Sequence, residues 1–409
     1  MQLQFFMTED LKTNINTGTG IPTTLKYFMA VSCGIMVANL YYCQPLLGDF
    51  ARIFNVSESA AAWINICSQL GYGLGLFFIV PVGDMISRRK LLTWMHVFAA
   101  LAVAGMALAV NIDMLYFFSI ATGLTATACQ VFLPLAAHLS NDEERGKVIG
   151  IIMGGLLSGI LLSRTLSGVV AELWGWRAVY WIAFGIMLLM AVLVYKMIPG
   201  EQPGFHGNYG KLMRSLFQMI WSEKVVRESS WIGACTFGAI SAFWSTMAFF
   251  LEKPPFSYPV SVIGLFGIVG LAGALISPYV GSVNDRKGPS LPMKAGIIIM
   301  LVGYAIMFLS IYSIIIVVAG IILIDVGLQA AHVPNITRVS SLIPEARTRL
   351  NTIYMTSFFI GGTLGSVFGS FAWDAFGWNG VCAIGILFVI AGGLPVFIRI
   401  KRKQKLLSS

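Results

Sequence analysis

The sequence has few charged residues and none of the common motifs for nucleotide or metal chemistry. Only 11% of its 409 residues are charged, against about 25% in an ordinary soluble domain. A Walker A loop is missing, because Phe205 and Leu212 stand where its first glycine and its serine or threonine are required. The four histidines and six cysteines have neither metal-ligand spacing nor a C-x-x-C pair. We therefore expect no ATP-driven step, no metal and no other cofactor.

The chain is instead rich in long apolar runs. Hydrophobic residues make up 57% of it, and twelve runs reach the length of about 20 residues that a membrane-spanning helix needs. The net charge of +9 is spread over the ends of these runs and forms no basic stripe with interleaved aromatic residues, so we expect no nucleic-acid partner. The fold class that follows is an all-α integral membrane protein with twelve transmembrane helices in contact with the lipid bilayer.

The distribution of polar residues predicts five parts of the chain. Most of the 27 lysines and arginines fall on one side of a twelve-span topology, which by the positive-inside rule places both termini in the cytoplasm. The predicted parts are a cytoplasmic tail (1–23), a six-helix bundle (24–197), a central cytoplasmic linker (198–228), a second six-helix bundle (229–399) and a cytoplasmic tail (400–409).

An internal repeat relates the two bundles. The loop sequence PVGDMISRRK at 81–90 has a counterpart, GSVNDRKG, at 281–288. Two further pairs, an arginine pair and a tryptophan pair, keep nearly the same offset of about 200 residues; they are Arg145 with Arg347 and Trp176 with Trp378. A repeat of half the chain length on apolar helices is typical of a transporter built from two pseudo-symmetric bundles.

These motifs resemble the major facilitator superfamily, in particular its bacterial drug-and-sugar efflux-type permeases. The second loop matches the family motif G-x-x-x-D-R-x-G, and the runs NLYYCQPLL at 39–47, ER at 144–145 and DVGLQ at 325–329 add to the resemblance, which covers roughly residues 24 to 400. It implies a monomer of the bacterial inner membrane that moves a small-molecule substrate by alternating access around a central site. The chain departs from the proton-driven drug exporters of the family at Ser119, Ile160 and Arg164.

Two ionisable residues lie deep within apolar runs. Asp325 is the one acid in the middle of a span, and Arg164 is comparably deep in helix five. Because a charge in lipid is costly, such residues are functional candidates. Asp325 is predicted to carry a coupling proton, and Arg164 to bind an anionic substrate group or to neutralise Asp325. The alternative is that they form a fixed pair, or bond to backbone carbonyls, and hold helices together.

Further polar residues within the spans are candidates for the same site. Asp325, Gln329 and His332 share one face of helix ten, where His332 is expected either to pass protons or to be a hydrogen-bonded packing group. The predicted substrate contacts are Asn39, Tyr42, Gln44, Gln130, Arg164, Trp244, Gln329 and Asn335. For the tyrosine at 42, a place in the interfacial aromatic belt is the alternative.

The two loop motifs are predicted to latch the halves together on the cytoplasmic side. Asp84 is expected at the start of helix eleven and Asp285 at the start of helix five, because a helix N-terminus attracts a carboxylate. The latch residues are Asp84, Arg88, Arg89, Asp285, Arg286, Arg145 and Arg349. The alternative is that both motifs are only tight hairpins with cytoplasmic charges.

The sequence therefore predicts a secondary transporter and not an enzyme. The first expectation is proton-coupled efflux of a small organic solute, with the protein acting as an antiporter. The alternative within the class is proton-coupled uptake of a small organic anion, drawn by Arg164. Two other classes, a non-transporting sensor on the same fold and a membrane enzyme, would need a large cytoplasmic domain or a cluster of catalytic groups, and we find neither in the sequence.

Overall fold

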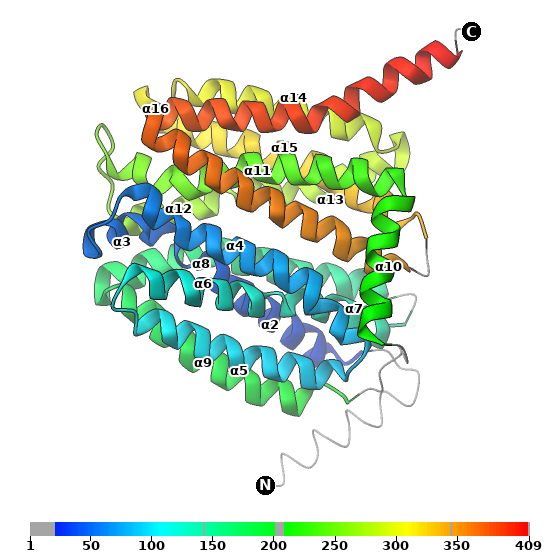
Figure 1. Cartoon of the computed structure of the whole chain (residues 1–409), viewed down its shortest axis with the longest axis horizontal. Helices are drawn as coiled ribbons and strands as arrows, with labels where there is room; N and C mark the ends of the chain where they lie inside the picture. The colour runs from blue at the N-terminus through cyan, green and yellow to red at the C-terminus, as the bar shows by residue number, and fades with distance from the viewer. Residues whose placement is uncertain (1–20, 142–143, 201–207, 344–345, 408–409) are drawn as a thin grey trace.

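The computed structural model describes residues 21–141, 144–200, 208–343 and 346–407, and every regular element in these ranges is helical. Long helices lie side by side and form a bundle (Figure 1). This confirms the predicted all-α membrane fold. Most of the predicted N-terminal tail, part of the central linker and the last two residues lie outside the described residues.

The first half of the bundle holds six spans. Its elements are α2 (Thr23–Tyr41), η1 (Gln44–Leu46), α3 (Leu47–Ile53), α4 (Glu58–Phe78), η2 (Val80–Asp84), α5 (Arg88–Ala107), α6 (Ile112–Ala126), α7 (Ala128–Leu139), α8 (Arg145–Trp174) and α9 (Trp176–Met197). Pro45 lies in η1, where a proline without its N–H group is compatible with the short turn that ends α2.

The second half holds the other six spans. Its elements are α11 (Lys224–Glu252), α12 (Val260–Val269), α13 (Leu271–Lys287), α14 (Ser290–Met307), η3 (Ser310–Tyr312), α15 (Ile314–Ser340) and α16 (Arg347–Leu407). Within α16 the backbone leaves helical geometry at Gly377, with φ of 59°, so this element contains two spans joined by a sharp turn. The left-handed backbone region explains why a glycine stands there.

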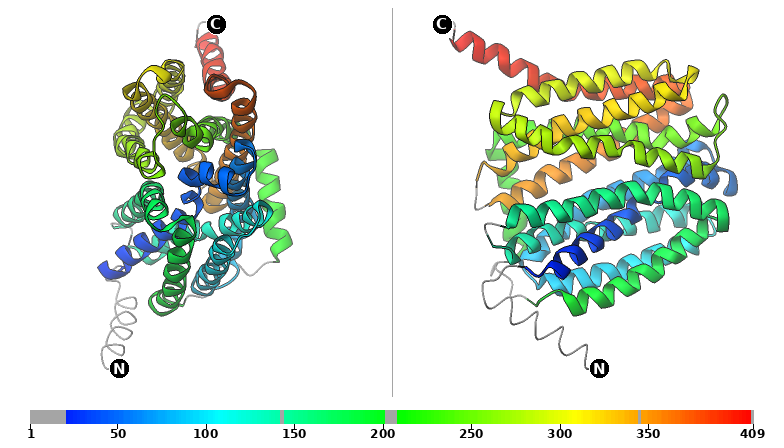
Figure 2. Two further views of the ribbon diagram at one scale, coloured as in Figure 1. Left: turned by 90° about the vertical axis from the view of Figure 1, so that its left-hand side faces the viewer. Right: turned by 180° about the vertical axis from the view of Figure 1, so that it is seen from behind.

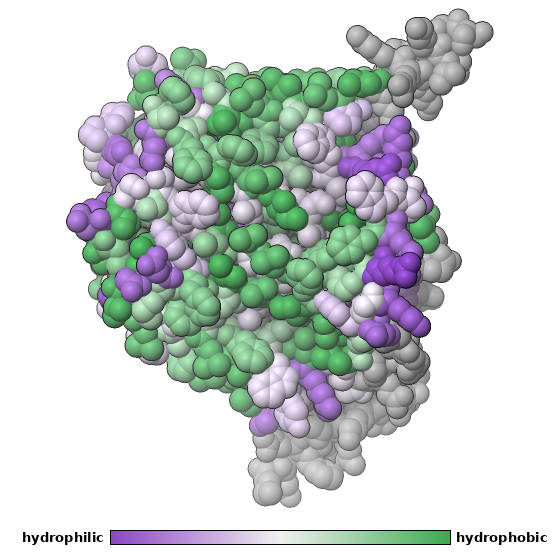
Figure 3. Space-filling view, in the orientation of Figure 1, coloured by the Kyte–Doolittle hydropathy of each residue, from purple (hydrophilic) through white to green (hydrophobic). Residues whose placement is uncertain are grey.

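Ten helical segments among the described residues are long and apolar enough to cross a membrane. One of them continues through the Gly377 turn and counts twice, and α12 with α13 forms one further crossing that is interrupted at Gly270. The result agrees with the predicted twelve spans. Figure 3 shows the apolar surface of these helices as a green band between hydrophilic residues at the two ends of the bundle.

The two halves repeat the same helix pairings. In the first half α2 packs on α8, α4 on α6 and α5 on α9; in the second half α11 packs on α16, α13 on α15 and α14 on α16. The end-on view in Figure 2 separates the yellow and orange helices of the second half from the blue and cyan helices of the first. The halves meet mainly where α4 lies on α16 and where α8 lies on α12. This arrangement is the predicted pair of pseudo-symmetric bundles.

Helix α10 (Tyr209–Ser222) lies across one end of the bundle, within the range predicted as a linker (Figure 1). It is fixed to the first half by the Tyr209 hydroxyl, which donates to the Phe78 carbonyl at 2.9 Å, and it also contacts α11 and α16 of the second half. We call this the α10 end, and the other is the opposite end. The element therefore ties the two halves together at the α10 end.

Glycines let the helices at the centre of each half approach closely. A side chain at Gly155 or Gly159 of α8 would collide with the backbone of α2 at Ala30 or Gly34. The second half repeats this contact, because Gly361 and Gly365 of α16 lie against the α11 backbone. This agrees with the tight packing expected from small residues spaced four apart.

Adjacent glycines of α8 provide a test of this packing. Gly155→Ala is expected to lower stability by about 1–3 kcal/mol, because the added methyl group overpacks the contact with α2. Gly154 has no heavy atom within 4 Å of the place where a Cβ would be. Gly154→Ala is therefore the matched control and should unfold at or above the wild-type temperature in detergent. Equal melting temperatures for the two variants would contradict this packing.

Candidate functional site

A cavity of about 580 Å³ lies between the two halves near the middle of the bundle. Helices α2, α4, α7 and α8 line it from the first half, and α11, α13, α15 and α16 from the second. Seven predicted site residues lie in its wall: Gln44, Gln130, Arg164, Trp244, Asp325, Gln329 and His332. Most of the remaining lining is apolar, as in many small-molecule sites.

Arg164 is the cation in the wall of this cavity. Its Nε atom donates to Gln44 Oε1 at 2.6 Å, and Gln44 in turn donates to Asn65 Oδ1 at 3.2 Å. The guanidinium carbon lies 4.0 Å from the centre of the Trp244 ring and 4.8 Å from that of Tyr41. Arg164 as a whole is only 6% exposed. Its guanidinium group is therefore held by one aromatic ring from each half.

Asp325 is the carboxyl group in the same wall. Its Oδ2 atom is buried and has no hydrogen-bond partner. No ion pair of 4.0 Å or less joins it to Arg164 in the described part of the chain, so the fixed pair considered from the sequence is not formed. Gly270 and Gly273, where helix α12 gives way to α13, pack directly on Asp325. An ionisable residue within a membrane span is a candidate for a functional role by default.

His332 lies on the same face of α15 as Asp325 and also lines the cavity. Its Nδ1 atom and the Tyr354 hydroxyl share a hydrogen bond of 2.9 Å, and its ring centre is 4.7 Å from that of Phe358. The ring is thus both hydrogen-bonded and packed against an aromatic neighbour. Gln329 reaches the cavity one turn away, as the helical spacing predicts.

Three predicted substrate contacts are not brought to the cavity. Asn39 donates to backbone carbonyls of its own helix and to Met187 Sδ at 3.3 Å, on the side of α2 that faces α9. Asn335 donates to the Ser229 carbonyl at 2.8 Å and connects α15 with α11. Tyr42 packs against the apolar core. For these residues the structure favours a packing role.

Several aromatic residues of the cavity wall were missed in the sequence. Tyr41 precedes Gln44 by three positions and follows Val37 by four, so all three lie on the cavity face of the first span. Gln69 and Tyr72 of α4 are likewise three positions apart, so they lie on one face of their helix and line the cavity. The remaining members are Phe237 of α11 and Phe358 and Phe359 of α16, which no polar neighbour distinguishes from ordinary apolar span residues.

The predicted latch residues lie at the α10 end. Asp84 pairs with Arg88 of its own loop at 3.4 Å, and η2, which ends at Asp84, contacts α16. Arg89 lies over the Tyr195 ring at 5.4 Å, and Arg145 donates to the Ala137 carbonyl at 3.1 Å. The other members of the set are Asp285, next to Asn284 Nδ2 at 3.4 Å, and the cations Arg286 and Arg349. A bond from Asp84 or Asp285 across the two halves stays a prediction.

Next to this set, the start of α8 is tied to α2. Lys26 Nζ donates to Glu144 Oε2 at 2.7 Å. This hydrogen bond and the charge of the lysine lower the pKa of the Glu144 carboxyl below its usual value. The carboxylate also precedes the first turn of α8, where a negative charge is favoured by the helix dipole.

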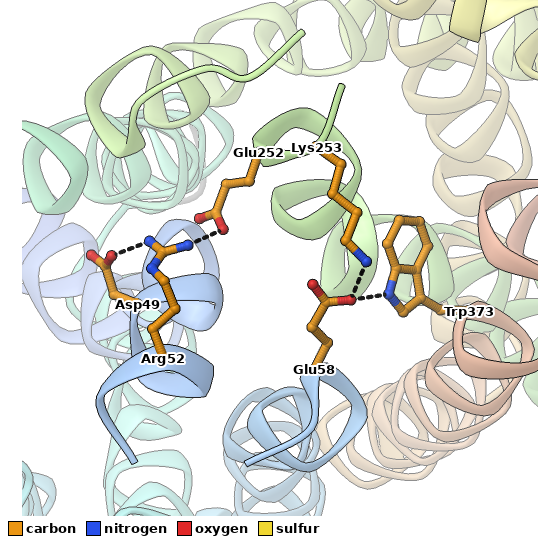
Figure 4. A network of polar contacts seen from close by, with 6 residues as sticks. All are labelled: Asp49, Arg52, Glu58, Glu252, Lys253 and Trp373. Carbon is orange, nitrogen blue, oxygen red and sulfur yellow. Dashed lines mark hydrogen bonds and ion pairs between the residues drawn. The ribbon is translucent and has the colours of Figure 1, made fainter. Parts of the chain in front are cut away.

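A network of charges closes the cavity at the opposite end (Figure 4). Arg52 of the first half bonds to Glu252 of the second at 2.7 Å and to Asp49 at 2.5 Å. Glu58 Oε2 accepts from Lys253 Nζ at 2.8 Å and from Trp373 Nε1 at 2.7 Å. The halves are therefore joined across their interface at this end, by residues for which the sequence predicted no such contact.

At the α10 end the wall is open. Gly150 and Gly154 of α8 line the cavity with no heavy atom within 4 Å of a Cβ position, and Pro278 of α13 lies on the other side. Both glycines are exposed. The cavity is thus accessible from the α10 end and closed at the opposite end.

Twelve apolar spans in two halves around a charged central cavity are the architecture of a secondary transporter. A family model described as Major Facilitator Superfamily matches residues 28–348 and 268–408. The chain belongs to the Major Facilitator Superfamily, and it is a multi-pass membrane transporter of that class.

Relatives and solved structures agree with this assignment. The uncharacterized transporter YgaY of Escherichia coli O157:H7 is 41% identical over 357 residues, which cover 87% of this chain and 91% of that protein. The inner membrane transport protein YnfM of Escherichia coli K12 is 24% identical over 394 residues, or 94% and 92% of the two chains. A bacterial homolog of the human lysosomal transporter Spinster, in an inward-facing and occupied conformation, has a TM-score of 0.75 at 14% identity over 93% of this chain and 97% of that chain. This last likeness concerns the fold alone.

The closure at the opposite end can be tested by chemical labelling. Replacing Glu58 and Glu252 together by Gln removes both carboxylate charges and should weaken the contact between the halves at this end. Each partly exposed ion pair contributes only about 0.2–1 kcal/mol, which allows the end to open and close reversibly. A cysteine introduced at Gln329, in the cavity wall, should then react faster with an impermeant maleimide applied to the opposite end. The six native cysteines are buried and provide a low background.

Asp113→Asn is the control, because this exposed acid lies at the start of α6, at the same end, and makes no bond to the second half within the described part of the chain. Labelling rates that are the same in the double variant and the wild type would show that the network does not hold the cavity closed.

Proposed function

We propose that this protein moves a small organic solute across the bacterial inner membrane by alternating access, as a monomer, and that proton binding at Asp325 drives the movement. The observation that carries the proposal is the buried Oδ2 atom of Asp325, which lies in the cavity wall without a hydrogen-bond partner. A group that gains and loses a proton during transport needs such freedom, since a fixed ion pair would hold its charge. His332, on the same helix face, is the proposed second member of the proton path.

The α10 end is proposed to face the cytoplasm. The positive-inside rule supports this orientation, because lysines and arginines gather in the helix ends and loops at that end of the described chain. In this orientation the cavity is open to the cytoplasm and closed toward the outside. The proposed latches at Asp84 and Asp285 would form when the two halves rock to the other state.

The first candidate direction is efflux in exchange for protons. The resemblance of the loop and helix motifs to efflux-type permeases supports it. In this cycle a solute that donates hydrogen bonds to the Asp325 carboxylate competes with the proton, so that each displaces the other.

The second candidate is uptake of a small organic anion together with a proton. One observation favours it: the terminal amino groups of Arg164 make no hydrogen bond in the described part of the chain and lie in the cavity wall. An anion on Arg164 would be repelled by ionised Asp325 and favoured by the protonated acid, so that proton and anion bind together.

The role of Asp325 can be tested with Asp325→Asn, which removes the titratable group and keeps its shape. The test solute is the compound that most raises the melting temperature of the purified protein in a panel of sugars, amino acids, organic acids and amines. In proteoliposomes with a pH gradient, we expect the variant to lose accumulation against a gradient and to keep exchange of labelled for unlabelled solute. Asp113→Asn is the control and should behave as wild type. A variant that still concentrates the solute would rule out Asp325 as the proton carrier.

The sign of the coupling can be read from protons released or taken up when the same solute binds in weakly buffered detergent solution. Exchange predicts release of protons, and cotransport predicts uptake. Asp325→Asn is expected to abolish either signal, because the titrating group is gone. An unchanged signal in that variant would place the coupled proton on another group.

A further inference from the structure

The guanidinium group of Arg164 is fixed in place while its two terminal amino groups remain available to a ligand. Among the described residues, only its Nε atom makes a hydrogen bond, with Gln44 at 2.6 Å, and Gln44 in turn donates to Asn65 at 3.2 Å. The guanidinium carbon lies 4.0 Å from the centre of the Trp244 ring and 4.8 Å from that of Tyr41, and these neutral rings hold the group without neutralising its charge. A guanidinium oriented in this way presents its terminal amino groups in the geometry that matches the two oxygens of a carboxylate.

The rest of the cavity offers an apolar surface of aromatic side chains. Phe237 and Phe358 stack at 4.0 Å with an interplanar angle of 18°, and Phe359 lies 5.0 Å from Phe237. Tyr72 extends this surface from the first half, 4.1 Å from Phe359. The surface is accessible in the same cavity as Arg164, so a ligand of suitable length contacts both.

The charges in the cavity determine the protonation state in which a carboxylate binds best. Arg164 and Asp325 are its cation and its acid, and they are not joined in an ion pair. With Asp325 ionised, a bound carboxylate would place two negative charges near one positive charge in a region of low dielectric constant. With Asp325 protonated, the carboxylate and Arg164 balance each other.

We infer that the substrate is a monocarboxylate with an aromatic or other apolar body, held by Arg164 at its carboxylate and by the Phe237–Phe358–Phe359 surface at its body, and that it binds together with a proton. This inference rests on the proposed transport function and favours its second candidate direction.

The test compares two series of three probes, and within each series the probes differ in the head group. Benzoate, benzamide and benzylamine, together with the longer series 4-phenylbutyrate, 4-phenylbutyramide and 4-phenylbutylamine, are titrated into the purified full chain, and binding is followed by isothermal titration calorimetry. We expect the carboxylates to bind at least about tenfold more tightly than their amides, a difference of about 1.4 kcal/mol, and more tightly at acid than at alkaline pH.

Variants locate the site. Arg164→Gln should lose carboxylate binding, and Arg164→Lys should retain only part of it, because an ammonium keeps the charge and lacks the fork. Arg177→Gln is the matched control: this arginine lies over the Trp176 ring at 4.3 Å and donates to the Ala109 carbonyl at 2.9 Å, away from the cavity. Asp325→Asn should bind the carboxylates as tightly at alkaline as at acid pH.

Amides or amines that bind as well as the carboxylates would overturn the inference, and this result needs no variant to fold. Carboxylate binding that survives in Arg164→Gln would also overturn it. The proposed transport function fails separately: carboxylates that bind through Arg164 without any proton-driven flux would refute proton-coupled transport and leave the binding site in place. If an amine shows proton-driven flux that depends on Asp325 and no carboxylate binds, the carboxylate inference is refuted and proton-coupled transport is retained.

Discussion

The structure depends on a positive charge buried where the two halves meet. A guanidinium at this depth is costly in a membrane unless polar and aromatic groups surround it. Arg164 receives them from both halves: Gln44 and Tyr41 from the first and Trp244 from the second. Gly267 of α12 lies against its side chain, so a larger residue there would displace it. The interface between the halves is therefore organised around a group that also faces the cavity.

The contacts within each half differ from the contacts that join the two halves. Within each half, helix pairs such as α2 with α8 are in backbone contact at glycines and behave as rigid units. Between the halves, α8 and α12 are also in close backbone contact, at Gly168 and Gly264, and the opposite end is closed by a small network of partly exposed charges around Glu58 and Arg52. Such pairs are individually weak. The rigid helix pairs within each half favour motion of the halves as bodies over local deformation, and the weak charge network at the opposite end can break in such a motion.

Much of the fold was predictable, because apolar length, the positive-inside rule and the half-length repeat each constrain it. Where the prediction failed, the signal was absent or ambiguous. Asn39 and Asn335 are polar residues in apolar spans, as Gln44 is, yet they bond to neighbouring helices. Which residues of a span face the cavity depends on how the helices pack together, and the local sequence of the span does not determine this. Helix α10 was hidden by the glycines around it, and the network of Arg52, Glu58 and Lys253 joins residues far apart in the chain. By contrast, Asp325 and Arg164 were found because charge in a span is rare.

Alternating access is the central claim, and distances between spin labels on the two halves test it most directly. One pair, at Lys147 and Ser290, spans the α10 end, and another, at Val110 and Tyr312, spans the opposite end; all four residues are exposed. On addition of a bound solute at acid pH, the distance at the α10 end should shorten as the distance at the opposite end lengthens. If both distances keep their starting values at every pH and solute concentration, or change in the same direction, the two halves do not alternate around this cavity.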